Sequence, residues 1–107
     1  MSDLNSFLGD PLVDPVYAPE VCEQRRLRIK LALAAYAYEY HASSIMSDGN
    51  FDAMCKKIDT SIDTGYRLLD RFFREEFSPD TGQWVHKHPE KDKLEWLYQR
   101  YYGKSKR

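Results

Sequence analysis

The chain has 107 residues, of which 42% are apolar, 31% are charged and 14% are aromatic, and its formal net charge is −1. This length and composition predict one folded globular domain and exclude a chain that is disordered throughout. The longest uninterrupted apolar run, residues 31–38, is far shorter than the roughly 20 residues that span a bilayer, so no transmembrane helix is expected.

Residues 1–18 are expected to form an extended or flexible arm, because Pro11 and Pro15 interrupt a segment without sustained periodicity. The chain begins without the basic and apolar stretches of a secretory signal, so we expect it to reside in the cytoplasm with Cys22 and Cys55 reduced. The sequence leaves open whether the apolar side chains of the arm lie across the helical body or on a partner; they are Phe7, Leu8, Leu12 and Val13.

A single helical domain is predicted over residues 19–103. Its first helix begins at Pro19, a residue suited to the first turn of a helix, and ends near residues 41–44. The first half of this helix, residues 25–30, is expected to keep one side in water. Ser47 is the expected N-cap of a second helix, in which apolar residues recur at helical spacing.

A third helix is predicted to end near Phe77, and residues 83–88 are expected to be a loop or a short extended piece. The last helix is predicted to have Pro89 in its first turn and Tyr101 in its core, and a basic tail of residues 104–107 follows it. These elements predict an all-α fold of three or four helices in a small orthogonal or bundle-like domain, with a homodimer as an open alternative.

The junction of the first two helices carries side chains typical of a binding site: Tyr40, His41, Asp48, Phe51 and Asp52. Tyr40 and Phe51 offer two aromatic faces to a flat ring, and helical geometry puts Tyr38 on a different face from Tyr40. Asp48 and Asp52 lie one turn apart, so both carboxylates can accept hydrogen bonds from ribose hydroxyls or pair with a cationic ring. The alternative is that the aromatic residues fill the core, Asp48 complements the helix dipole and His41 is an exposed helix-end base.

These residues resemble the N-terminal domain of NAD-dependent DNA ligases, which recognises nicotinamide mononucleotide. That domain carries a Tyr and a His at the end of one helix and an Asp-x-x-Tyr-Asp motif at the start of the next, and the similarity covers residues 25–75. Here Phe51 replaces the family tyrosine, and the segment from His41 to Asp48 is about two residues shorter. The resemblance implies NAD or nicotinamide mononucleotide as the ligand, and it implies a relative of the short ligase-related proteins encoded in phage and prophage genomes.

Ligase chemistry is not expected, because the family's nucleophile is the lysine of a Lys-x-Asp-Gly motif. The chain has one Asp-Gly pair, Asp48-Gly49, and Met46 stands in the place of the lysine. No other catalytic arrangement is recognisable. The sequence therefore predicts a small non-catalytic binding protein.

Two other functions stay open. The first is a protein-interaction module that inhibits or redirects a host or defence protein through the apolar arm and an aromatic surface. The second and weaker one is nucleic-acid binding by the basic C-terminal helix, through Trp96, Arg100, Tyr102 and the tail. His86 and His88 have the spacing of two metal ligands, but without a third nearby ligand no metal site is predicted.

Overall fold

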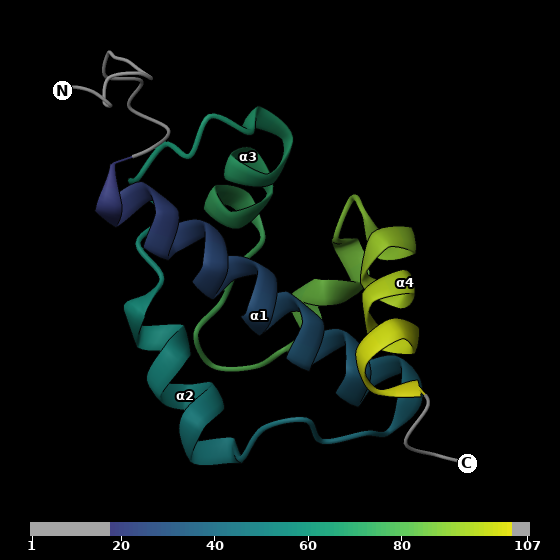
Figure 1. Ribbon diagram of the computed structural model, residues 1–107. Coiled ribbons are helices and arrows are strands. Elements are labelled where there is room, and N and C mark those ends of the chain that lie inside the picture. Colours follow the sequence, from purple (N-terminus) through teal and green to yellow (C-terminus); the bar gives the residue numbers. More distant parts are fainter. Residues whose placement is uncertain (1–17, 104–107) are drawn as a thin grey trace, which may run out of the picture.

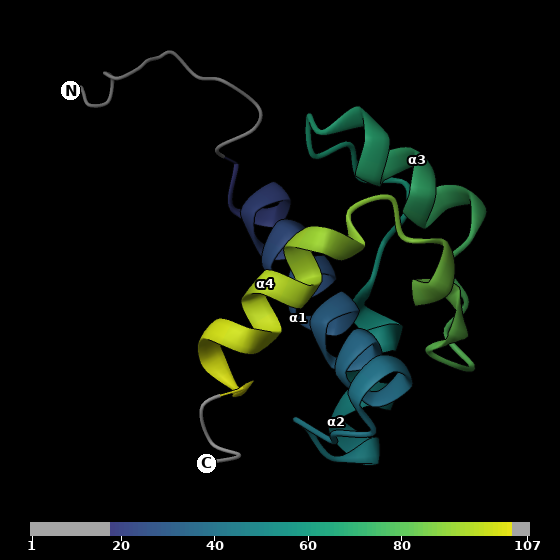
Figure 2. The same cartoon turned by 90° about the vertical axis from the view of Figure 1, so that its right-hand side faces the viewer.

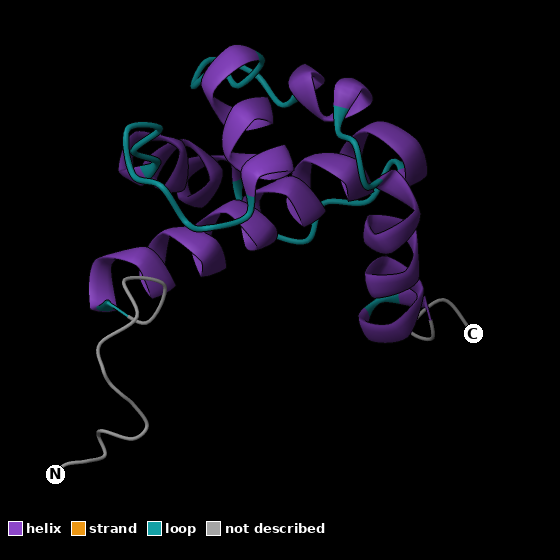
Figure 3. Cartoon of the chain, turned by 90° about the horizontal axis from the view of Figure 1, so that it is seen from above, coloured by secondary structure: helices purple, strands orange, loops and turns teal. Residues whose placement is uncertain are grey.

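The structure, a computed structural model, describes residues 18–103, and every regular element within them is a helix (Figures 1 and 3). The predicted all-α fold is confirmed. The elements are α1 (Pro19–His41), α2 (Asp48–Lys57), α3 (Arg67–Glu75), the 3-10 helix η2 (Gln83–Lys87) and α4 (Lys91–Tyr101). The predicted tail and all but the last residue of the predicted arm lie outside the described residues. None of the helices within residues 18–103 is long and apolar enough to cross a membrane.

The long helix α1 is the centre of the fold, because α2, η2 and α4 all contact it (Figures 1 and 2). Residues 31–37 of α1 are buried at every position. A helix that is covered on several sides needs apolar or small residues around most of its circumference, and this stretch consists of Leu, Ala and Tyr. The shared helix α1 therefore fixes where α2, η2 and α4 lie.

Local capping signals define both ends of the α1 to α2 connection. The hydroxyl of Ser47 accepts a hydrogen bond from the backbone N–H of Asn50 at 3.1 Å, so the predicted N-cap is confirmed. At the other end, Ala42 adopts a left-handed conformation with φ of 51°, and the N–H groups of Ala42 and Ser43 both donate to the carbonyl of Ala37. The connecting segment thus leaves α1 in a defined direction.

Residues 83–87 form the helix η2, which corrects the expectation of a loop or extended piece. The physical reason is burial: Trp84 is 5% exposed and Val85 is fully buried, and a helical turn directs this adjacent pair into the core. The Trp84 ring lies 5.5 Å from the ring of Phe73 and 5.3 Å from that of Phe77, measured between centroids. This aromatic cluster joins α3 and the segment after it to η2.

One further expectation is confirmed and two are corrected. The stretch of residues 25–30 keeps one side in water, since positions 25, 26, 29 and 30 are exposed, whereas Arg28 is buried and pairs with a carboxylate of α3. Pro89 precedes the N-cap of α4 and is not in its first turn. Tyr101 is 64% exposed, because the buried face of α4 follows a spacing of four residues through Leu94 and Tyr98.

Candidate functional site

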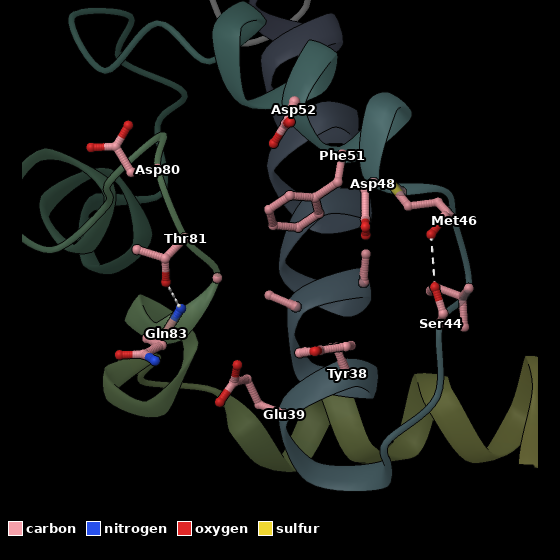
Figure 4. A pocket seen from close by; sticks show the side chains of 14 residues that line it. Tyr38, Glu39, Ser44, Met46, Asp48, Phe51, Asp52, Asp80, Thr81 and Gln83 are labelled. Carbon is pink, nitrogen blue, oxygen red and sulfur yellow. Dashed lines mark hydrogen bonds between the residues drawn. The ribbon is translucent and has the colours of Figure 1, made fainter.

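A cavity of about 440 Å³ opens between α1, the segment that leads to α2, α2 itself and the residues before η2 (Figure 4). Each of these four segments contributes to the lining. The lining residues are Ala34, Ala35, Tyr38, Glu39, Ser44, Ile45, Met46, Asp48, Phe51, Asp52, Asp80, Thr81, Gly82 and Gln83. A volume of this size is within the range of small-molecule sites, about 300 to 1,000 Å³.

Small residues bring α1 and the segment before η2 close together at the cavity. A Cβ atom on Gly82 would lie 3.1 Å from the Cβ of Ala35 and 3.4 Å from Cζ of Phe51. Any larger residue at Gly82 would therefore push this segment away from α1 or from the Phe51 ring. Ala34 and Ala35 are buried and leave space beside the aromatic side chains.

Two aromatic side chains line the cavity. Phe51 comes from α2, is half-buried and packs against the hydrophobic core. Tyr38 comes from α1 and is 66% exposed. Figure 4 shows the Phe51 ring in the middle of the site, with Tyr38 farther along α1. A flat ligand that enters here meets apolar faces from two helices.

Four carboxylates line the same cavity: Glu39, Asp48, Asp52 and Asp80. Among the lining residues, all of which belong to the described part of the chain, none is a lysine, arginine or histidine. Behind the cavity wall, burial raises the pKa of the Cys55 thiol. The negative charges of Asp52 and Asp80 raise this pKa further. The site is therefore strongly acidic.

Asp48, Phe51 and Asp52, three of the five residues predicted for the site, meet at this cavity, whereas Tyr40 and His41 do not line it. The Tyr40 ring stacks on that of Tyr36 at 4.6 Å, and its hydroxyl lies 2.9 Å from Nδ1 of His86. The expected pairing of Tyr40 with Phe51 is thus replaced by Tyr38 and Phe51.

His41 faces α4. Its ring stacks on that of Tyr98 at 4.1 Å, and its Nε2 lies 2.7 Å from Oε1 of Glu95. The same oxygen accepts a hydrogen bond from the Tyr36 hydroxyl at 2.6 Å, and Oε2 accepts one from Gln99. The hydrogen bonds from Tyr36, His41 and Gln99 lower the pKa of Glu95 to about 2. His41 therefore belongs to the contact between α1 and α4.

The two residues predicted for the site on α1, Tyr40 and His41, lie away from the cavity. Tyr36 and Tyr40 do share a face, as their spacing indicates, and Tyr38 is on the other. The one sequence feature that points to Tyr38 and Glu39 as site residues is their position immediately before Tyr40. Asp80 and Gln83 carried no such signal, because only the tertiary fold brings them next to α2.

The two histidines of the His-x-His motif have separate surroundings. His88 is 5% exposed, its ring lies against Phe72, and its Nδ1 accepts a hydrogen bond from the N–H of Glu90 at 3.0 Å. Burial lowers the pKa of His88 to about 4. His86 instead contacts Tyr40 and Glu39. Over residues 18–103 no group of three or more His, Cys, Asp or Glu side chains is arranged to hold a metal ion.

No protein-family model matches the chain, and neither the curated proteins nor the solved structures gave a significant match. The fold and the cavity define the class of protein by themselves. It is a small helical domain with an acidic cavity lined by two aromatic rings.

Proposed function

We propose that the protein is a small non-catalytic binding protein whose cavity recognises the nicotinamide ring of a nicotinamide nucleotide or nucleoside. The observation that carries this proposal is the meeting of Phe51, Tyr38, Asp48 and Asp52 at one cavity of about 440 Å³. Oxidised nicotinamide is a flat ring with a positive charge. Aromatic faces and nearby carboxylates are the groups that stabilise such a cation, and the carboxylates also accept hydrogen bonds from ribose hydroxyls.

The resemblance to the ligase N-terminal domain supports the same ligand. The segment from His41 to Asp48 is about two residues shorter than in the ligase domain, and Tyr38 precedes Tyr40 by two residues. Counting from Tyr38 therefore restores the ligase spacing. In this alignment Tyr38 takes the role of the family tyrosine, and Glu39 stands where the family has its histidine.

A role without catalysis follows from the residue in place of the nucleophile. Met46 lines the cavity and has no group that can attack a phosphate. We propose a cytoplasmic protein of phage or prophage type that holds its ligand without transferring any part of it.

Isothermal titration of the folded protein with nicotinamide riboside, nicotinamide mononucleotide and NAD tests the proposal. We expect at least one of them to bind, and Asp52→Asn to weaken binding because it removes a carboxylate from the lining. The matched control is Asp92→Asn, which makes the same change at an exposed position of α4 and should leave the affinity unchanged. If folded protein gives no heat with any of the three at millimolar concentration, the proposal is wrong.

A second candidate function is supported by the exposed face of α4. Trp96 is 60% exposed and Tyr101 is 64% exposed, and the Arg100 guanidinium lies over both rings, at 5.5 and 5.8 Å from their centroids. Trp, Tyr and Arg are the residues most enriched at the energetic centres of protein interfaces. This face suits the alternative of a module that binds a host or defence protein.

Affinity capture from host lysate tests the second function. A specific partner should be retained by the unaltered protein and lost with Trp96→Ala, while Tyr38→Ala on the cavity should keep it. Retention of nucleic acid that disappears as salt is raised would instead favour the nucleic-acid alternative. If the unaltered protein and Trp96→Ala capture the same partner equally, the exposed face of α4 is not the binding surface.

A further inference from the structure

We infer that the cavity selects a positively charged ligand without a phosphate group: an organic cation with a flat ring and hydroxyl groups, such as a pyridinium nucleoside. The inference rests on the proposed function and names the ligand class of the same site. It predicts different affinities for the nucleoside and the nucleotide, which share the ring but differ by the negative charge of the phosphate.

All of the charged side chains that line the cavity are negative. α1 contributes Glu39, α2 contributes Asp48 and Asp52, and the segment before η2 contributes Asp80. The fourth wall, residues 44–46, is uncharged. A phosphate attached to a bound ring would therefore meet carboxylates on three walls and no cation on the fourth. Figure 4 shows these carboxylates spread around the Phe51 ring rather than gathered on one side.

The start of α2 does not offset this charge. Phosphate groups bind well at helix N-termini that have free backbone N–H groups and no competing acid. Here the Ser47 hydroxyl already accepts from the N–H of Asn50, and Asp48 occupies the first turn. The negative side chain takes the position at which an anionic ligand would gain from the helix dipole.

His86 can carry a positive charge and contacts the lining residue Glu39, but both of its ring nitrogens are engaged. Nε2 lies 2.8 Å from Oε1 of Glu39, and Nδ1 lies 2.9 Å from the Tyr40 hydroxyl. Turning the ring toward a phosphate would break both contacts and leave Glu39 without its partner. His86 therefore orients Glu39 and is not available as a phosphate ligand.

The test compares four probes by isothermal titration at pH 8 and low salt. They form two matched pairs: 1-methylnicotinamide with nicotinamide, which differ in the ring charge, and nicotinamide riboside with nicotinamide mononucleotide, which differ in the phosphate. We expect the methylated cation to bind more tightly than neutral nicotinamide. We expect the riboside to bind on the order of tenfold more tightly than the mononucleotide, since several carboxylates of one cavity repel a dianion even in water at low salt, where charges are screened only beyond about 10 Å or more.

Two variants link the preference to the cavity. Glu39→Gln and Asp80→Asn each remove one negative charge and should reduce the difference in affinity between riboside and mononucleotide, which we call the affinity gap. Raised salt should reduce this gap further. Glu23→Gln, an exposed carboxylate near the start of α1, is the control and should leave the gap unchanged. Circular dichroism checks that every variant is folded.

The outcomes separate the two proposals. Mononucleotide binding as tight as that of the riboside, or tighter, overturns the charge selection and leaves the proposed function standing. A gap that persists unchanged in both Glu39→Gln and Asp80→Asn also overturns it. Absence of binding by both ribose-containing probes and by NAD overturns the proposed function itself.

Discussion

Arg28 of α1 and Asp70 of α3 form a buried ion pair, in which Nη1 donates to Oδ1 at 2.8 Å and the side chains are 5% and 1% exposed. Nη2 of Arg28 also donates to the carbonyls of Asp59 and Ile62, and the N–H and hydroxyl of Thr64 donate to Asp70. Burial alone would raise the pKa of Asp70, but the hydrogen bonds from Thr64 and the charge of Arg28 outweigh it and lower the pKa. The pair fixes the loop between α2 and α3.

Asp70→Asn is expected to lower the free energy of unfolding by about 3 kcal/mol, because it leaves the Arg28 charge buried without its counterion. Urea denaturation measures the change. The control is Glu75→Gln, which breaks the Arg71 to Glu75 pair, whose side chains are 73% and 56% exposed. That substitution should cost less than about 1 kcal/mol. Similar losses from both would show that burial does not set the strength of the pair.

The stability of the protein should fall between pH 6.5 and pH 4 because of His88. Its pKa is lowered to about 4 in the folded state, whereas an unfolded histidine has a pKa near 6.5. In this window the unfolded chain binds more protons, so the free energy of unfolding decreases as the pH falls, by roughly 3 kcal/mol in total. Urea denaturation at several pH values measures it.

Two further measurements attribute this decrease to His88. An NMR titration of the unaltered protein should find its ring neutral well below pH 6, and a ring that protonates near pH 6.5 would contradict the prediction. His86→Gln, at an exposed histidine two residues away, should keep the pH dependence of the window. His88→Gln should flatten it.

The left-handed end of α1 predicts a stabilising substitution. Ala42 has a φ of 51°, which is unfavourable for a residue with a Cβ atom, so Ala42→Gly should raise the free energy of unfolding by about 1 kcal/mol. Ala53→Gly is the matched control, since the same change at an exposed position inside α2 should lower it by about 1 kcal/mol. Thermal denaturation should therefore shift in opposite directions for the two variants. A shift in the same direction would contradict the cap assignment.

Tyr38 and Tyr40 should differ in their effect on ligand binding. Tyr38→Ala removes an aromatic wall of the cavity and should weaken the binding of nicotinamide riboside on the order of tenfold. Tyr40→Ala removes a ring that stacks on Tyr36 and should change the affinity much less. Isothermal titration of both variants checks the prediction, and the reverse order would restore the pairing of Tyr40 with Phe51 that the sequence suggested.

Helix boundaries could be predicted from the sequence where a local signal fixes them. Pro19 and the Ser47 cap mark the starts of α1 and α2, because proline geometry and a side-chain cap act within a few residues. The burial of Arg28 and of Trp84 could not be predicted in the same way, since each depends on a partner far along the chain.

The candidate site could be predicted only in part, because only some of its residues follow a local sequence pattern. Asp48, Phe51 and Asp52 belong to one helix, and their shared orientation follows from its period. The face of α1 that meets them could not be chosen, because residues 31–37 are apolar or small around the whole helix. Which side of such a helix borders a cavity depends on where α2 and α4 pack.

The hydrogen atom that Gly82 carries in place of a side chain lets the segment that bears Asp80 lie close to α1 and to the Phe51 ring. The contact of Gly82 with Ala35 and Phe51 sets how near the segment of residues 80–83 approaches α1 and α2. Asp80 is on that segment, and Asp48 and Asp52 are on α2. The strength of the electric field that a ligand meets on entry is thus tuned by backbone approach, at a residue that has no charge of its own.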